Sequence, residues 1–219
     1  MKKYELTNDT IKIDNITLYR IKRISDGLVG GFIESEANLS QHGSCFVYGE
    51  ASVFGEARVA GEARVAGKVR VFGEALVYDE THVFGEALIY GEARVYGEAR
   101  VYGETHVFGE ARVYGDARVY GDARVYGETH VFGEALIYGE ARVFGETYVE
   151  NLVQNCIIYK HNITLAGDYI SIGCENHTIE HWKENIDDIG KNNGYNKKEV
   201  KAIKYILNGL LIMRRENEK

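Results

Sequence analysis

The sequence predicts an all-β solenoid that carries a small C-terminal α+β appendage of short strands and two helices. The main observation is an unbroken run of six-residue repeats from Val47 to Tyr148. Composition agrees, because 25 Gly and 16 Tyr stand beside no Pro in 219 residues, which is typical of a repeat protein. After Val149 the repeat stops and helical patterns begin. These changes divide the chain into an N-terminal lead-in (1–27), a β-helix (28–149) and a C-terminal segment (150–219).

The repeat consists of seventeen consecutive hexads such as VYGEAR, each beginning with Val or Ile and carrying Ala, Thr or Val at its fifth place. A period of six does not fit a helix, but it fits a strand of four residues (Ala-Arg-Val-Tyr) joined to the next by a Gly-Glu turn. Alternation along the strand then directs Ala and Val inward and Arg and Tyr outward. Gly suits the tight corner.

These hexads resemble the hexapeptide repeat of left-handed parallel β-helices, the fold of the LpxA-like acyltransferase superfamily. The resemblance implies triangular coils of three hexads each, so that every third hexad stacks vertically, and it implies a homo-oligomer, dimer or trimer. The segments GGFIESEANLSQHGSCFVYGEASVFG (30–55) and ISIGCENHTIEHW (170–182) also resemble hexapeptide-repeat proteins of phages and prophages, whose functions are unassigned. Residues 28–46 are expected to form a first, irregular coil.

The C-terminal segment predicts short strands followed by two amphipathic helices. Residues 150–174 have the β-branched content of strands. A first helical stripe and a second one, opened by the capping pair Asn196 and Glu199, follow in turn. The first stripe comprises Ile179, Trp182, Ile186 and Ile189, and the second Val200, Ile203, Ile206, Leu207 and Leu210. We expect this segment to cap the open end of the solenoid, where strand edges would otherwise be unpaired.

The charge of the repeat and the lack of long apolar segments indicate which partners and which cellular location to expect. Between Val47 and Val149 there are 10 Lys and Arg against 17 Asp and Glu, a net charge of −7, which argues against nucleic-acid binding by the repeat. The chain has no apolar stretch long enough to span a membrane, and its start lacks the apolar core of a signal peptide. We therefore expect a cytoplasmic protein, with Cys45, Cys156 and Cys174 as reduced structural thiols.

Three copies of ETHVFGEA place histidines at His82, His106 and His130. Their spacing of four hexads is one and one-third coils, so successive histidines should lie on different faces and cannot bind one metal ion. No metal or cofactor is expected. LpxA-like acyltransferases commonly use a histidine at a subunit boundary as general base, so the resemblance leaves open an enzyme that binds acyl-CoA at a subunit interface. The repeat lacks the loop insertion expected of such an enzyme.

Aromatic side chains at the second place of the hexads should form three vertical columns. The only uninterrupted column, and the richest in Phe, is our candidate interface. We expect a second subunit or the C-terminal helices to cover it, because large exposed apolar patches tend to mark contacts. This candidate interface comprises Phe54, Phe72, Tyr90, Phe108, Tyr126 and Phe144, together with Trp182 of the C-terminal segment.

The corners should form acidic columns, whose mutual repulsion we expect neighbouring Arg ladders to offset. The sequence favours a non-enzymatic interaction protein, phage-encoded, that binds a protein partner and modulates or inhibits a host process such as a defence system. The alternatives are the acyltransferase-like enzyme, a structural spacer, and a mimic of nucleic-acid phosphates.

Overall fold

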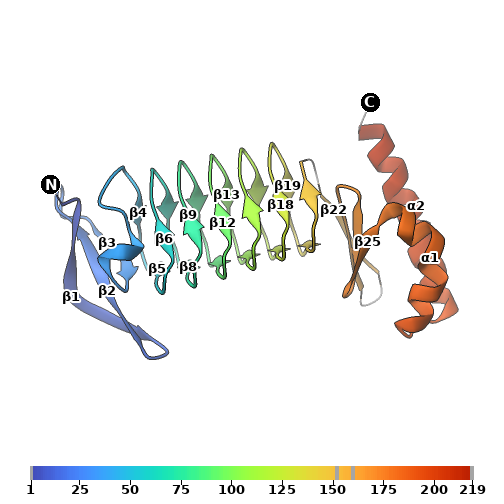
Figure 1. Cartoon of the computed structure of the whole chain (residues 1–219), viewed down its shortest axis with the longest axis horizontal. Coiled ribbons are helices and arrows are strands. Elements are labelled where there is room, and N and C mark those ends of the chain that lie inside the picture. Colours follow the sequence, from blue (N-terminus) through green and yellow to red (C-terminus); the bar gives the residue numbers. More distant parts are fainter. Residues whose placement is uncertain (1, 151–152, 159–160, 218–219) are drawn as a thin grey trace.

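The chain forms an elongated molecule in which a β-solenoid joins an N-terminal hairpin to a C-terminal unit of sheet and helices (Figure 1). This computed structural model describes residues 2–150, 153–158 and 161–217. The predicted fold class is confirmed: the parallel coils, the small antiparallel sheet and the two helices are all present.

The solenoid has three faces, each a ladder of parallel two-residue strands. Face I contains β5 (Ser52–Val53), β8 (Arg70–Val71), β11 (Leu88–Ile89), β14 (His106–Val107), β17 (Arg124–Val125) and β20 (Arg142–Val143). Face II contains β4 (Phe46–Val47), β7 (Arg64–Val65), β10 (His82–Val83), β13 (Arg100–Val101), β16 (Arg118–Val119) and β19 (Leu136–Ile137). Face III contains β6 (Arg58–Val59), β9 (Leu76–Val77), β12 (Arg94–Val95), β15 (Arg112–Val113), β18 (His130–Val131) and β21 (Tyr148–Val149).

Strands one coil apart pair in register, so equivalent residues of every third hexad are neighbours, as His82 and Arg100 are. The regular ladder covers two residues and not the four that we predicted. The residue after each pair still bonds to the next coil, as the Tyr78 amide does to the Val95 carbonyl at 3.1 Å. The strands are short because the backbone already turns toward the corner at this residue.

The interior contains two small side chains from each hexad. The inward Ala and Val residues of the repeat are buried, as alternation predicts. Thr replaces Ala at four inward places, and its hydroxyl donates to the carbonyl three residues earlier, as in the 2.6 Å bond from Thr105 to Tyr102. These bonds satisfy hydroxyls that would otherwise be costly to bury.

Glycine is required at the corners for two reasons. Gly109 has φ +69°, and a Cβ atom there would lie 3.0 Å from the amide nitrogen of Gly127 in the next coil. At the equivalent place of another hexad, Asp79 adopts φ 60°, a conformation that Asp tolerates better than most residues. The corner therefore needs both a left-handed backbone and the absence of a side chain.

At the N-terminal end, β1 (Tyr4–Ile13) and β2 (Ile16–Arg23) form an antiparallel hairpin that continues through β3 (Val29–Ile33) into the sheet of face I. A 3-10 turn, η1 (Glu36–Asn38), belongs to the irregular first coil. Buried Tyr4 donates its hydroxyl to the Leu39 carbonyl at 2.7 Å, which fastens the hairpin to that coil.

The C-terminal unit packs an antiparallel sheet against two helices. The strands are β22 (Gln154–Ile158), β23 (His161–Ala166), β24 (Tyr169–Ile172) and β25 (Glu175–Thr178), and the helices are α1 (Ile179–Asn192) and α2 (Lys197–Asn217). Both helical stripes are confirmed in a separate core, except that Ile206 is only partly buried and the side chain of Leu210 lies outside the described residues, as does that of Cys156. The predicted capping pair also forms: the Asn196 side chain accepts from Glu199 N, and Glu199 accepts from Asn196 N.

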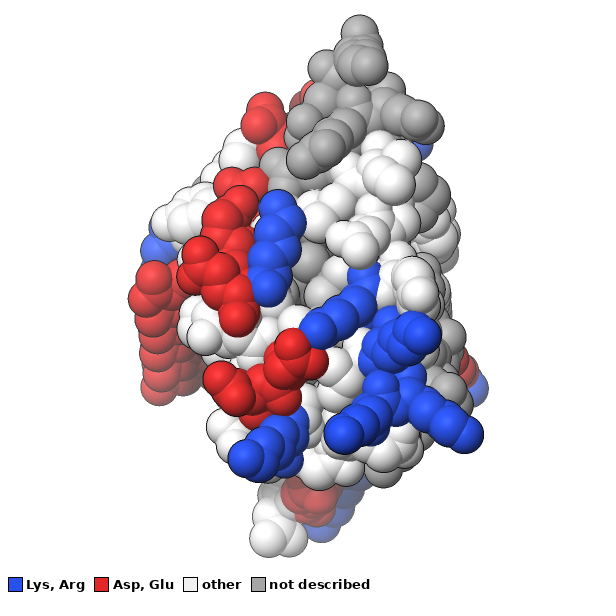
Figure 2. Space-filling view, turned by 90° about the vertical axis from the view of Figure 1, so that its right-hand side faces the viewer, with Lys and Arg blue, Asp and Glu red and all other residues white. Residues whose placement is uncertain are grey.

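Charge is unevenly divided between these two helices. Figure 2 looks at the C-terminal end and shows acidic and basic side chains gathered in separate groups. The exposed acids of α1 are Glu180, Glu184, Asp187 and Asp188, whereas α2 begins with Lys197 and Lys198. One ion pair, Lys204 to Asp187 at 2.6 Å, joins the helices.

Side chains of the C-terminal sheet satisfy backbone groups of the last coil. Asn176 donates to the Phe144 carbonyl at 2.7 Å, and Thr164 accepts from the Arg142 amide at 3.1 Å. Asn162 donates to the Glu140 carbonyl. The unit thus covers the end of the solenoid without adding another parallel coil, which protects an edge that would otherwise pair with other chains. No helix in the described part of the chain is long and apolar enough to cross a membrane.

We predict that Gly109→Ala lowers the free energy of unfolding by about 1–2 kcal/mol, because alanine is strained in the left-handed region. A matched control is Gly209→Ala in α2, where an added Cβ would meet nothing within 4 Å. That change should raise helix stability by about 0.5–1 kcal/mol. Guanidinium unfolding followed by circular dichroism measures both, and equal effects of the two substitutions would contradict this account of the corner.

Candidate functional site

The three repeated histidines do not share a site. His82 lies on β10 of face II, His106 on β14 of face I and His130 on β18 of face III. This is the scatter that a spacing of four hexads predicts on coils of three. Each imidazole lies outward and half-buried in the position that Arg or Leu occupies in other hexads.

The folded structure lowers the pKa of each of these three histidines. Partial burial lowers the pKa of His82, His106 and His130, and nearby arginines lower it further: Arg64 and Arg100 beside His82, Arg124 beside His106, and Arg112 beside His130. Burial is the main cause of all three pKa shifts, so the shifts do not distinguish one histidine as a catalytic base.

The three aromatic columns differ in how regularly their rings stack, which the residue types alone do not show. On face I all six rings, from Phe54 to Phe144, form one stack, with neighbouring centroids 4.7–5.2 Å apart and planes within 7° of parallel. On face III four rings stack, from Tyr78 to Phe132. On face II the rings are further apart, and Phe84 is tilted by 32° to Tyr102. The predicted column is therefore the longest and most regular stack.

Stacking determines what face I can bind. Because each ring covers the next, the ring faces are unavailable along the stack and only the ring edges reach the surface. Stacking on a sugar or a nucleobase needs an open ring face, whereas ring edges present C–H groups of positive partial charge. Burial also raises the pKa of the Tyr90 and Tyr126 hydroxyls, so both remain neutral donors at physiological pH.

Among the described residues, the N-terminal strands cover the first tier of face I, and Asn176 of the C-terminal sheet contacts the backbone of the last tier. Phe54 is 9 % exposed and packs in a cluster with Leu18 and Phe32 of the N-terminal strands. The other five rings of the stack are half-buried. The C-terminal helices lie at the end of the solenoid and not along this face (Figure 1). Coverage by a second subunit stays a prediction.

Trp182 does not lie at the surface where our candidate interface placed it. Its side chain is 1 % exposed, and its indole N–H donates to the Ile170 carbonyl at 2.7 Å. The helical stripe that contains Trp182 is the buried face of α1. The residue therefore stabilises the C-terminal unit.

The corner carboxylates of the repeat form few direct ion pairs. The only ion pair found between residues 47 and 149 joins Lys68 to Glu86 at 2.8 Å, apart from the Arg20–Glu50 pair that the hairpin supplies. The arginines of the repeat lie on the strands, one residue before the inward Val, and none of them forms an ion pair with a corner carboxylate. The predicted offset therefore does not come from direct ion pairs among the described side chains, and its longer-range electrostatic part stays a prediction.

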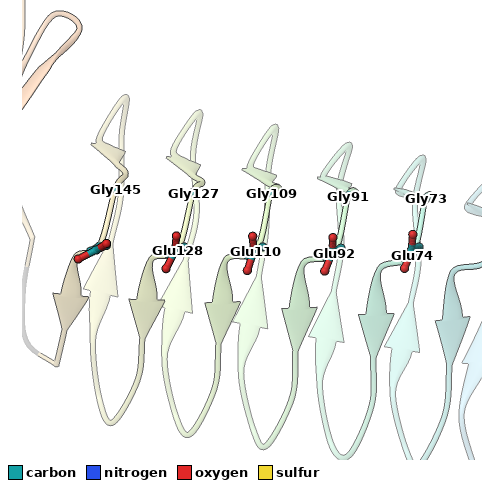
Figure 3. Close-up of a pocket in the computed structure, with 10 residues that line it drawn as sticks. Gly73, Glu74, Gly91, Glu92, Gly109, Glu110, Gly127, Glu128 and Gly145 are labelled. Carbon is teal, nitrogen blue, oxygen red and sulfur yellow. The ribbon is translucent and has the colours of Figure 1, made fainter.

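One corner forms a groove beside the aromatic stack of face I (Figure 3). Its volume is about 710 Å³, and it is lined only by the corner glycines and glutamates of five successive coils. We call it the acidic groove: Gly73, Glu74, Gly91, Glu92, Gly109, Glu110, Gly127, Glu128, Gly145 and Glu146. The sequence predicted this column of glutamates, but it did not predict that the column forms a groove; the signal for the groove was the vertical alignment of the Gly-Glu pairs.

Two smaller hollows on the solenoid are different in charge. One contains His106, Arg124 and Arg142 beside Glu104, Asp122 and Glu140. The other contains Arg118 beside Asp116 and Glu134. Of these three hollows, only the acidic groove has carboxylates without a cation.

A smaller polar cluster joins β25 to the end of α1. Asn193 and His177 both contact the Glu175 carboxylate, at 3.0 and 2.7 Å, and these contacts lower the pKa of Glu175. His181 stacks on His177 with centroids 4.4 Å apart. The cluster orients the strand on the helix, which is a structural role. Of the two described cysteines, Cys45 is buried, as expected of a structural thiol, and Cys174 is exposed.

Comparison with known families supports the repeat. A family model described as the YdcK beta solenoid repeat matches residues 111–127 and 117–132, a segment that includes β15 to β18. This match supports a left-handed β-helix repeat. None of the curated proteins matches the sequence.

We predict that the histidines make stability depend on pH. Because the folded state lowers their pKa from 6.5, the unfolded state binds more protons, and stability should fall as pH decreases below about 6.5. Replacing all three by Leu, which occupies the same hexad place in other coils, should flatten the dependence between pH 7.5 and about 5.5. Urea unfolding at several pH values measures this, with Arg58→Leu as the control because arginine does not titrate there. An unchanged slope in the triple variant would contradict the burial of the three imidazoles.

Proposed function

We propose that this chain is a non-enzymatic interaction protein that binds a protein partner through face I. The observation that carries the proposal is the continuous stack of six rings beside a column of glutamates without ion pairs. A long, rigid, half-buried aromatic surface with a charged border is typical of protein contact surfaces, where aromatic residues are enriched.

The rigidity of face I favours this role. Its strands are fixed by bonds to the coils above and below, so binding would cost little backbone ordering. The stack spans five coil intervals, which at about 4.8 Å each gives a surface about 24 Å long. That length suits a helix or another solenoid as the contacting element.

The cellular context that we propose comes from the sequence resemblance. The segments that resemble phage and prophage hexapeptide-repeat proteins support a location in the cytoplasm of a bacterial host. In that setting the partner would be a host protein, and occupying it would modulate or inhibit a host process such as a defence system. The LpxA-like resemblance adds self-association, as a dimer or trimer, to the proposal.

Acyl transfer has less support. The coils run without an inserted loop from β4 to β21, and each repeated histidine lies in a different sheet. A general base needs an orienting partner and a pocket of its own. The three imidazoles share no cavity, and none of them forms a hydrogen bond or ion pair with a carboxylate of the described residues.

A crosslinking experiment in the native host tests the proposal. We predict that a photoreactive phenylalanine at Tyr90 of face I crosslinks to a defined protein, because this ring edge lies at the centre of the stack. The same substitution at Tyr96 of face III is the matched control, since Tyr96 also lies in a stack and is also half-buried. Mass spectrometry would identify the product, and the purified partner would be tested for direct binding.

The outcomes separate the functions. A protein crosslinked from Tyr90 and absent from Tyr96 supports the proposal. Equal products from both positions, or none from either, would favour a spacer role. A product that contains only a second copy of the chain would assign face I to self-association. That result would contradict the proposal that face I binds another protein.

A further inference from the structure

The acidic groove and the aromatic stack lie side by side along the same five coils. In each hexad the ring stands two residues before the glutamate, as Phe108 does before Glu110, and the intervening glycine adds no side chain. The surface is thus one apolar stripe beside one acidic stripe, both running along the solenoid axis, and Figure 3 shows the residues of the acidic stripe aligned from coil to coil. We propose that this double stripe binds an amphipathic α-helix whose apolar stripe is bordered by lysines or arginines.

Charge complementarity identifies the occupant. The carboxylates of Glu74, Glu92, Glu110, Glu128 and Glu146 form no ion pair with any described residue, and no Lys or Arg lines the groove. Stacked like charges repel at this spacing, so cations from a partner would relieve that repulsion. A nucleic acid would add phosphates to an acidic surface. The described His, Cys, Asp and Glu side chains also form no group of three that could hold a metal ion.

The spacing of the carboxylates suits a helix better than an extended strand. Successive glutamates are one coil apart, about 4.8 Å, and successive turns of an α-helix advance about 5.4 Å. A basic residue on each turn therefore falls close to one carboxylate per coil, and the small mismatch is within the reach of a flexible lysine. Alternate residues of an extended strand lie about 6.6 Å apart, which loses register within two coils. The backbone of face I is also already paired on both sides, so a strand could not join its sheet.

The apolar stripe supplies the second contact. Five of the stacked rings are half-buried by their neighbours and expose their edges, so leucines of the helix would cover apolar surface that the chain leaves open. The rings are fixed by stacking, which reduces the ordering cost on binding. The order of the two stripes around the solenoid also gives the helix a preferred direction.

This inference rests on the proposed function and can fail separately from it. The probe is a fluorescent peptide of about 18 residues with lysines at i, i+4, i+7 and i+11 and leucines on the adjacent stripe. Its control is a peptide of the same composition with the stripes scrambled. Fluorescence anisotropy at low ionic strength measures the dissociation constants for the full chain.

Two protein variants make the test specific, and each removes five negative charges. The groove variant replaces the glutamates at positions 74, 92, 110, 128 and 146 by Gln. The control variant changes the corner between faces III and II, with Gln at positions 62, 80, 98 and 134 and Asn at position 116. We expect the striped peptide to bind the native chain at least about tenfold more tightly than the scrambled one, and the groove variant to lose that difference. The control variant should stay within about twofold of the native chain.

Three results would overturn the inference: no binding of the striped peptide, equal binding of the scrambled peptide, or equal weakening by the two variants. Comparison with the crosslinking experiment separates the two proposals. If Tyr90 crosslinks to a partner and the groove variant keeps that product, face I binds a protein of another class. If neither the crosslink nor peptide binding is found, the proposed function fails as well.

Discussion

Each coil of the solenoid is held by backbone hydrogen bonds to the coil three hexads further along the chain. These bonds require that every coil contain the same number of residues, turn at the same three corners and keep only small side chains inside. The hexad satisfies all three requirements with inward Ala and Val and a corner Gly. Interior Thr is accepted because its hydroxyl bonds to a carbonyl of its own corner. An insertion of a few residues would break the register of every later coil, which is consistent with the uninterrupted repeat.

Because successive coils pair in register, the surface of the solenoid repeats along its long axis. Any residue type that recurs in every third hexad becomes a continuous column, whereas one that recurs in every fourth hexad is distributed over three faces. The histidines illustrate the second case, and the rings of face I illustrate the first. A functional surface on such a scaffold is therefore a stripe rather than a pocket, and its partner is most simply an elongated element. The caps matter for the same reason: the hairpin extends the sheet of face I at one end, and Asn162, Asn176 and Thr164 bond to the last strand of face I and its corners at the other.

Periodicity made much of this structure predictable. The hexad gave the coils, the inward and outward residues and the order of each column, and helical spacing gave the buried stripes of α1 and α2. Contacts between segments without a common period could not be predicted in this way. The attachment of the β1–β2 hairpin to face I depends on packing around Phe54, and the burial of Trp182 depends on which side of α1 the sheet occupies. The lack of Arg–Glu pairs depends on side-chain direction, which places arginine on a flat strand and glutamate on a corner. For the acidic groove, the sequence contained the aligned Gly-Glu pairs, but the absence of cations became evident only in three dimensions.

The register of three hexads per coil is the central claim, and engineered disulfides test it most directly. Residues 82 and 100 are direct strand partners on face II, whereas residue 106 lies on face I. Cysteines replacing His82 and Arg100 should therefore form an intramolecular disulfide on mild oxidation, since their Cα atoms would lie about 5 Å apart, within the range that disulfides allow. Cysteines replacing His82 and His106 should stay reduced. Intact mass after thiol labelling, with Cys174→Ser in both variants, distinguishes the two states. A disulfide between positions 82 and 106, or none between 82 and 100, would contradict the register on which the faces and the groove depend.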